Sequence, residues 1–268
     1  MKNGKFLSGF LLLSALSAIS ACKKVIQVDL NNAAPQIVIE GEITNGQNPY
    51  QVKISKTVNF SASNSFPPVS GATVQVTDSN NGFAYPFIET SPGIYLANNF
   101  MGVTQHTYQL SVLAEGKTYT ASSTMPAPVH LDSISFVQNL DLNNKSAINA
   151  VVNFQDPPGL GNYYQFTEFV NNIQVPDIFV FDDRLSDGKY IRNTLYNDTA
   201  RLHVNDTVLV KMYCVDKNIY NYFFTLFEIS GNNSFQSASP ANPVSNISNG
   251  ALGYFSAHTI SVKQIIVY

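Results

Sequence analysis

The chain has 268 residues, of which 44% are hydrophobic, 12% are aromatic and only 12% are charged. Its 15 basic and 18 acidic residues give a formal net charge of −3, which argues against a nucleic-acid-binding protein because such proteins need a clustered basic surface. The aromatic residues are all Tyr and Phe, and most polar residues are uncharged, which is typical of extracytoplasmic β-proteins.

Residues 1–21 predict a lipoprotein signal peptide. Lys2 and Lys5 form a positive start, and the apolar run after them is too short and too rich in serine to span ~30 Å of hydrocarbon. The run ends in Ile-Ser-Ala-Cys, which resembles a bacterial lipobox. We therefore expect Cys22 to become the first mature residue and to carry acyl chains such as palmitate. Without the two lysines, 13 basic residues face 18 acidic ones, a net charge of −5.

Residues 22–30 form the predicted lipidated tether, and residues 31–125 predict a β-sandwich domain. Short runs in this part alternate between apolar and polar residues, which is the pattern of half-buried strands. In one of them Val74 and Val76 would face the core and Gln75 the solvent. The predicted strands are residues 36–44, 50–58, 72–78, 83–89, 94–97, 107–114 and 117–123.

Pro126 and Pro128 favour an extended connector, so the domain boundary is placed at residues 125–129. Residues 130–268 then form a second β-rich domain with one helix. The fold class is mainly β, with an immunoglobulin-like or prealbumin-like β-sandwich at the N-terminal end. The predicted strands of the second domain are residues 131–137, 147–154, 162–170, 207–215, 252–258 and 259–267.

One segment after Asp216 predicts a helix. Asp216 is a suitable N-cap and Gly231 a suitable stop. The apolar residues between them recur at helical spacing: Ile219, Tyr220, Phe223, Phe224 and Phe227. An almost uncharged loop follows at residues 232–249, and it is either a contact surface or a lock that holds the helix against the closing strands.

Two stretches resemble known families. Residues 70–78 and 91–95 carry a Gly-Ala-x-Val-x-Val strand and a Gly-x-Tyr strand, which resemble prealbumin-like or carboxypeptidase-regulatory-like sandwiches. Residues 242–255, Asn-Pro-Val-Ser-Asn-Ile-Ser-Asn-Gly-Ala-Leu-Gly-Tyr-Phe, follow the aromatic helix. Together with the lipobox and the Asp-rich loop, they resemble the domain-of-unknown-function 4249 family.

This second resemblance implies a lipoprotein of Bacteroidetes, anchored by lipid in the outer membrane of the cell envelope and associated with a TonB-dependent transporter. The family has no established activity, so it implies no catalytic residues. Lys23 and Lys24 follow the lipidated cysteine where a surface-export pattern would have acidic residues, which leaves both the periplasmic and the surface face open. The candidate contact residues are Asn242, Asn246, Tyr254 and Phe255.

The search for catalytic motifs is negative. The sequence has no Gly-x-Ser-x-Gly, His-Glu-x-x-His, phosphate-loop or dinucleotide motif. Cys214 lies in a strand-like run and is interpreted as a small buried hydrophobe. The histidines are scattered, without metal-ligand spacing, and we expect no metal site and no cofactor: His106, His130, His203 and His258.

Two local features each allow two interpretations. The acidic loop from Asp182 to Gly188 could begin a cation site, but Leu185 stands where an EF-hand would place a ligand, which favours a solvated turn. Tyr163 and Tyr164, with the two aromatic contact candidates, could stack on sugars or peptides, or could pack in the core.

The leading hypothesis is a non-catalytic accessory binding protein of a nutrient-uptake system. Anchoring by lipid and the lack of a catalytic motif support it, while the transporter association is an analogy. The alternatives are a structural or adhesive envelope protein and a hydrolase with an unmarked carboxylate site.

Overall fold

The computed structural model describes residues 34–46, 49–59, 65–98, 100–140, 146–197, 199–230 and 242–268. Residues 35–268 form one compact unit, and it is mainly β, as the sequence predicts. The predicted signal peptide, Cys22 and the tether lie outside the described residues.

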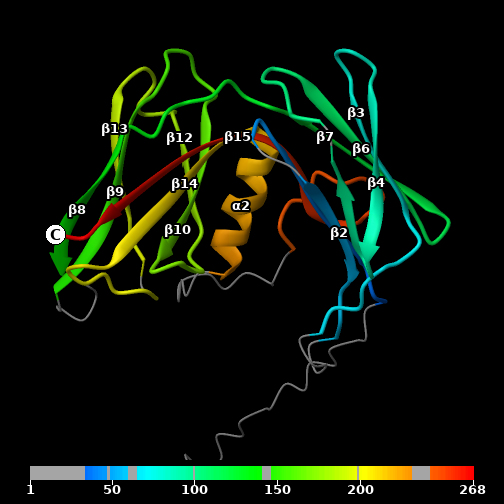
Figure 1. Ribbon diagram of the computed structural model, residues 1–268, viewed down its shortest axis with the longest axis horizontal. Coiled ribbons are helices and arrows are strands. Elements are labelled where there is room, and N and C mark those ends of the chain that lie inside the picture. Colours follow the sequence, from blue (N-terminus) through cyan, green and yellow to red (C-terminus); the bar gives the residue numbers. More distant parts are fainter. Residues whose placement is uncertain are drawn as a thin grey trace, which may run out of the picture. The chain divides into compact units, whose positions relative to one another are not determined.

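The first half contains seven strands that fold into a sandwich-like pair of layers (Figure 1). Strand β4 pairs with β5 on one side and with β3 on the other, so the sheet turns back on itself and encloses the first hydrophobic core. Alternation explains the burial, because Val74 and Val76 are buried between neighbours that are exposed or half-buried, as predicted. The strands are β1 (Ile37–Thr44), β2 (Tyr50–Lys56), β3 (Thr73–Asp78), β4 (Ala84–Ser91), β5 (Ile94–Ala97), β6 (Thr107–Ala114) and β7 (Lys117–Thr124).

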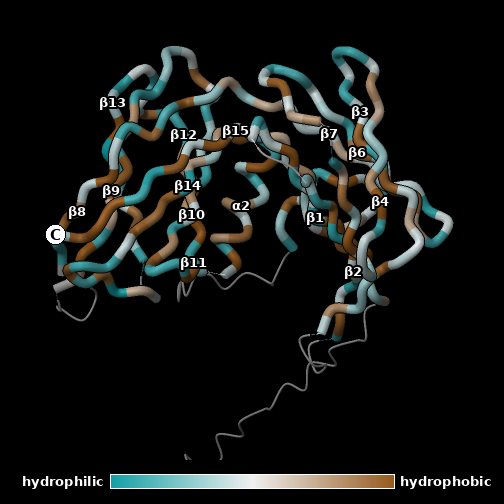
Figure 2. The backbone as a smooth tube through the Cα atoms, viewed as in Figure 1, coloured by the Kyte–Doolittle hydropathy of each residue, from teal (hydrophilic) through white to brown (hydrophobic). Residues whose placement is uncertain are grey.

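The second half adds a separate sheet in the order β13-β9-β8 and extends the large sheet with β11-β10-β14-β15. Side chains from both sheets form the second core, with Phe154 and Tyr164 among its largest members. Hydrophobic stretches follow the strands, whereas several connecting turns are hydrophilic (Figure 2). The elements are β8 (Ser133–Leu140), β9 (Ser146–Gln155), β10 (Tyr163–Val170), β11 (Ile173–Gln174), β12 (Phe179–Asp182), β13 (Tyr190–Leu195), β14 (Thr207–Val215), α2 (Lys217–Ser230) and β15 (Leu252–Ile266).

Strand β15 takes part in both halves. Two strands were predicted at residues 252–267, but the structure has one strand of 15 residues. Its first part pairs in parallel with β1, and its second part pairs antiparallel with β14. Phe255 and Ala257 therefore pack in the first core, although they lie within the range assigned to the second domain. Whether the halves separate near residues 125–129 stays a prediction.

Three short strands, β11, β12 and β13, were not predicted from the sequence. Strand β11 has two residues, and both are exposed, so its sequence carries no alternation to detect. All four residues of β12 are partly buried, which again removes the two-residue period. Apart from β15, the other strands agree with the predicted ranges to within three residues at either end.

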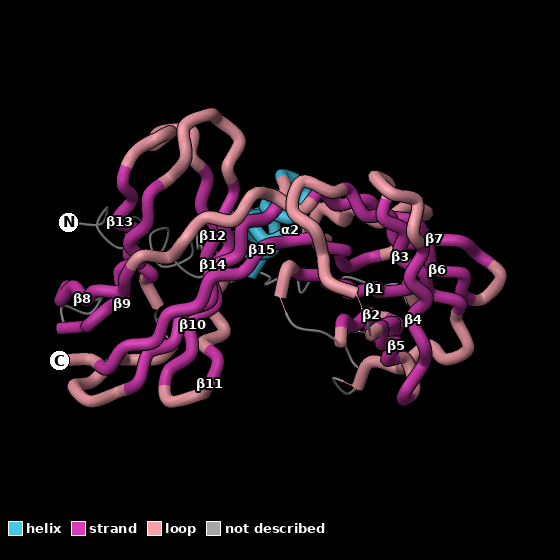
Figure 3. The backbone as a smooth tube through the Cα atoms, turned by 45° about the horizontal axis from the view of Figure 1, so that its top comes forward, coloured by secondary structure: helices cyan, strands magenta, loops and turns pink. Residues whose placement is uncertain are grey.

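Helix α2 begins at its predicted cap, Asp216, which connects the end of β14, the helix and β7. Asp216 Oδ1 accepts hydrogen bonds from the backbone N–H groups of Asn218 at 2.8 Å and Ile219 at 3.1 Å. Its Oδ2 accepts from Ser123 Oγ at 2.5 Å and from the Thr124 N–H at 3.1 Å, both in β7. The helix lies beside β15 near the middle of the view (Figure 3). Among the described residues, no helix combines the length and the apolar character needed to cross a membrane.

Gly253 makes the close contact between β15 and β1 sterically allowed. Its φ is +92°, and a Cβ atom at this position would lie 2.0 Å from the carbonyl oxygen of Ile39. A side chain would therefore require both a strained backbone and a separation of the two strands.

Gly253→Ala should lower the free energy of unfolding by about 2–4 kcal/mol, because it adds backbone strain and a clash with Ile39. Gly250→Ala is the matched control, because its φ is +73° and a Cβ there would meet no atom within 4 Å. The control should cost only ~1 kcal/mol for the positive φ. Urea unfolding of both variants measures the difference, and equal losses would contradict the argument.

Glu168 is a carboxylate buried in the second half. It is fully buried, its Oε2 accepts a hydrogen bond from Asn197 Nδ2 at 2.8 Å, and its Oε1 has no hydrogen-bond partner in the described structure. Burial, with the charge of Asp177 nearby, raises the pKa of Glu168 to about 7.

Glu168 should make the folded state lose stability as pH rises. Its folded pKa lies above the ordinary value of 4.5, so the native state holds the proton more tightly, and stability falls between pH 4.5 and 7. The decrease should be ~3 kcal/mol, at 1.36 kcal/mol per pKa unit. Glu168→Gln should unfold at a similar urea concentration to the wild type at pH 4 and at a higher one at pH 8. A Glu168→Gln variant whose stability depends on pH in the same way as that of the wild type would contradict this explanation.

Candidate functional site

Two hollows lie on the face of the large sheet that is opposite the first and second cores. On this face α2 packs against the sheet in a third hydrophobic cluster, which includes Phe223 and Tyr254. The first hollow has a volume of about 450 Å³ and the second about 290 Å³, and Glu42 and Tyr254 line both. We therefore treat them as one feature, the sheet groove. Its lining residues are Gln51 and Lys53 of β2, Glu40, Glu42 and Thr44 of β1, Tyr254, Ser256 and His258 of β15, Lys211 and Tyr213 of β14, Gln165, Thr167 and Phe169 of β10, Gln174 of β11, Phe223 of α2, and Pro49 and Tyr50.

Strand alternation places these side chains in the groove. In β1, Ile39 and Ile43 face the first core, so Glu42 between them faces the other side of the sheet. In β15, Phe255 faces the core and Tyr254 the groove. The strands follow the order β11-β10-β14-β15-β1-β2, so the groove crosses six neighbouring strands.

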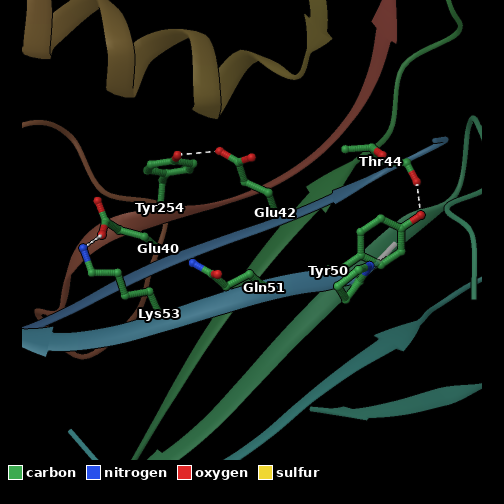
Figure 4. A pocket seen from close by; sticks show the side chains of 8 residues that line it. Glu40, Glu42, Thr44, Tyr50, Gln51, Lys53 and Tyr254 are labelled. Atoms are coloured by element: carbon green, nitrogen blue, oxygen red, sulfur yellow. Dashed lines mark hydrogen bonds and ion pairs between the residues drawn. The ribbon is translucent and has the colours of Figure 1, made fainter. Parts of the chain in front are cut away.

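In the first hollow the charged groups have partners (Figure 4). Lys53 Nζ lies 3.2 Å from Glu40 Oε2, because the two residues are directly opposite each other in the β1–β2 pair. The Tyr254 hydroxyl donates a hydrogen bond of 2.6 Å to Glu42 Oε1. Burial and the charge of Glu42 raise the pKa of Tyr254 well above its ordinary value, so the phenol stays protonated and remains a donor.

The second hollow contains a buried histidine. His258 is only 4% exposed, its Nδ1 lies 2.9 Å from Ser256 Oγ, and its ring stands edge-on to Tyr213 at 5.0 Å. Its Nε2 has no hydrogen-bond partner in the described part of the chain. Burial lowers the pKa of His258, so the imidazole is neutral near pH 7 and offers one unused polar atom.

The Ser256–His258 pair suits hydrogen bonding better than nucleophilic catalysis. Ser256 lies inside β15 and pairs with Glu42 of β1 in the parallel ladder. In α/β-hydrolases the nucleophilic serine lies instead on a sharp strand-to-helix turn, beside backbone N–H groups that stabilise an oxyanion. The groove therefore has the chemistry of a binding surface: hydroxyls, amides, one imidazole, and charges that already have partners.

The four predicted contact residues have different environments. Tyr254 lines the groove. Phe255 is fully buried in the first core, so its side chain has no surface to offer a partner, which contradicts its prediction as a contact residue. Asn246 Oδ1 accepts from the Phe255 N–H at 3.0 Å, and its Nδ2 donates to the Phe255 carbonyl at 2.8 Å. Asn242 is exposed and lies outside the groove lining. Residues 232–241 of the predicted contact loop lie outside the described residues.

Asn246→Ala should lower the free energy of unfolding by ~2 kcal/mol, because two backbone groups of Phe255 lose their partner. Asn242→Ala, at an exposed position of the same segment, should change it by less than ~0.5 kcal/mol. Thermal unfolding of both variants measures this. If Asn246→Ala is as stable as the wild type, its amide has no structural role and is free for a contact role.

Two of the three aspartates of the acidic loop, Asp183 and Asp187, lie close to Asp156, which belongs to another turn. Ligand oxygens of Asp156, Asp183 and Asp187 lie within 4.8 Å of one another, whereas Asp182 pairs with Arg184 at 2.8 Å. Asp156 accepts hydrogen bonds from the Gly188 N–H and the Tyr164 hydroxyl. Asp183 accepts from the N–H groups of Gly161 and Asn162, and Asp187 accepts from the N–H of Gly159. The cluster thus ties the turn at residues 157–162 to the turn at residues 183–188 by hydrogen bonds.

The remaining candidates lie away from the groove. Tyr164 is buried in the second core, and Tyr163 packs against Tyr220 at 5.0 Å, so neither ring presents a free stacking face. Cys214 is buried, and burial raises the pKa of its thiol, which agrees with a small core residue. Three histidines make separate contacts: His106 with Asp78, His130 with Ser261, and His203 with Asp206.

The comparison with protein families covers most of the chain. The model of the domain of unknown function DUF4249 matches residues 23–264. The chain belongs to this family. The match includes every strand and the helix of the described fold except the last two residues of β15, so the sheet groove lies within the DUF4249 domain. No curated protein matches the chain at a significant level.

Of the groove residues, the sequence predicted only Tyr254 as a contact residue, and whether it contacts a partner stays a prediction. Glu42, Ser256 and His258 were each visible only as outward positions of alternating strands, and such positions are usually solvated surface. Only the parallel pairing of β1 with β15 places Glu42 opposite Ser256, and the two residues are more than two hundred positions apart. No local motif could have predicted this contact.

Proposed function

We propose that this protein is a lipid-anchored, non-catalytic binding component of the outer membrane, associated with a TonB-dependent nutrient-uptake system. The observation that carries the proposal is the sheet groove, which crosses six strands and is lined by polar side chains whose charges have partners within it. Concave, preformed surfaces with a few converging polar groups and aromatic rings are the usual form of binding sites for small ligands.

The lipid anchor rests on the lipobox ending at Cys22. Several acyl chains hold a protein on a membrane much more firmly than one, at ~0.8 kcal/mol per buried CH₂. Anchoring would keep the groove close to a transporter in the same membrane and raise the local concentration of the bound ligand there.

A hydrolase is the second candidate, because Glu40 and Glu42 both face the groove from alternate positions of β1. Paired carboxylates act as acid and base in glycoside hydrolases. Glu40 is paired with Lys53 and Glu42 with Tyr254, however, and a general acid needs a carboxyl that is free to protonate the ligand. This arrangement favours binding over hydrolysis. An adhesive envelope role remains the third candidate.

Cys22→Ala should release the protein from the membrane fraction of its native host or leave it unprocessed at a higher mass, because no acyl chain can be attached. Fractionation with immunoblotting measures the distribution. Cys214→Ala is the matched control, since that cysteine is buried in β14 and should not affect anchoring. A processed, membrane-bound Cys22→Ala variant would disprove the lipoprotein assignment.

Co-purification of a TonB-dependent transporter with the wild-type protein from detergent-solubilised membranes tests the partner.

A further inference from the structure

We infer that the sheet groove binds a short, uncharged oligosaccharide that lies across the strands. The inference rests on the proposed binding function and adds the chemical class of the ligand. The groove spans six adjacent strands, so its length is five strand spacings, or ~24 Å at 4.8 Å each. This length suits an extended chain of several sugar rings better than a single small molecule.

The charges of the groove favour a neutral ligand. Its lining contains two carboxylates, Glu40 and Glu42, and two ammonium groups, Lys53 and Lys211, so its net charge is zero. Each of these charged groups already has a favourable contact. Glu40 pairs with Lys53, Glu42 accepts a hydrogen bond from Tyr254, and the ammonium of Lys211 lies 5.1 Å from the ring centre of Phe169. A charged ligand would have to displace one of these contacts to find a partner.

The polar side chains favour a ligand rich in hydroxyl groups. The amides of Gln165 and Gln174 and the hydroxyl of Thr167 each donate and accept hydrogen bonds, as sugar hydroxyls do. His258 also lines the second hollow, but its unpaired Nε2 is shielded from solvent, so the hydrogen bonds to the ligand would come from the two amides and Thr167. An apolar ligand would leave these groups without water or partners, which is costly.

The aromatic side chains supply the apolar part of the site. Tyr213, Phe223 and Tyr254 line the second hollow together with the polar groups. Tyr254 packs against Tyr222 at 4.9 Å and against Phe223 at 5.1 Å, and Tyr213 stands edge-on to His258 at 5.0 Å, so these rings are only partly exposed. A sugar ring can place an apolar C–H face against their exposed parts and its polar edges against the amides.

A peptide fits this groove less well. Extended peptides are usually bound by adding a strand to a sheet edge through main-chain hydrogen bonds. The groove lies instead on the face of the sheet. At its centre, β15 pairs with β1 and β14, and β1 also pairs with β2, so the central strands already use their backbone groups in the ladder.

The test uses the full-length lipidated protein in detergent micelles and isothermal titration calorimetry. The probes are neutral tetrasaccharides of α-linked glucose, β-linked glucose, β-linked mannose and β-linked xylose, an acidic tetragalacturonate, and an extended Ser-Gly-Ser-Gly-Ser peptide. We expect at least one neutral tetrasaccharide to bind, and the acidic one and the peptide to bind at least tenfold more weakly.

The double variant Gln165→Ala/Gln174→Ala should raise the Kd of the best tetrasaccharide by about tenfold or more, because two hydrogen-bonding amides are lost. The two positions are half-buried and exposed and do not form the core. The control is Gln75→Ala, an exposed glutamine of β3 outside the groove, which should change binding less than twofold. Circular dichroism confirms that each variant is folded.

Three results would overturn the inference: no neutral tetrasaccharide binds, the acidic sugar or the peptide binds more tightly, or the double variant binds as well as the wild type. These results leave the proposed function standing if Cys22 is lipidated and the transporter co-purifies. Conversely, sugar binding by a protein that lacks the anchor or the transporter would refute the proposed function and keep the ligand assignment.

Discussion

The pairing of β15 with β1 and β14 is the interaction on which the other parts of the fold depend. It joins the first and the last described strands of the chain in parallel and continues the same sheet into the second half. The close approach at Gly253 makes this pairing possible, and Phe255 of the same strand fills the first core. The cap of α2 reinforces it, since Asp216 contacts Ser123, whose hydroxyl accepts the N–H of Ala257.

The same pairing creates the groove. Side chains on one face of β15 complete the cores, so the alternate side chains must line the opposite face, where they meet those of β1 and β14. The core and the candidate site are therefore two faces of one sheet. A substitution that shifted the register by one residue would move Tyr254 into the core and Phe255 into the groove, and would damage both together.

The sequence predicted the features that are encoded locally. Alternation gave most strands, Asp216 and the aromatic spacing gave the helix, and the residue motifs gave the family. It did not reveal that residues 252–266 form one strand, because two alternating segments without a turn signal look the same whether the strand is continuous or interrupted. Nor did it predict the partners of Glu42, because pairing between distant strands depends on the register of the whole sheet. Tyr254 was found through its motif, and Phe255 was misassigned because adjacent strand residues face opposite sides.

The position of β15 near the C-terminus has a consequence for the order in which the protein can form. As the chain is synthesised from its N-terminus, the seven strands of the first half become available before β15, which completes their core, has been made. Neither half can therefore reach its final packing until β15 has been synthesised, and these contacts between distant segments close slowly.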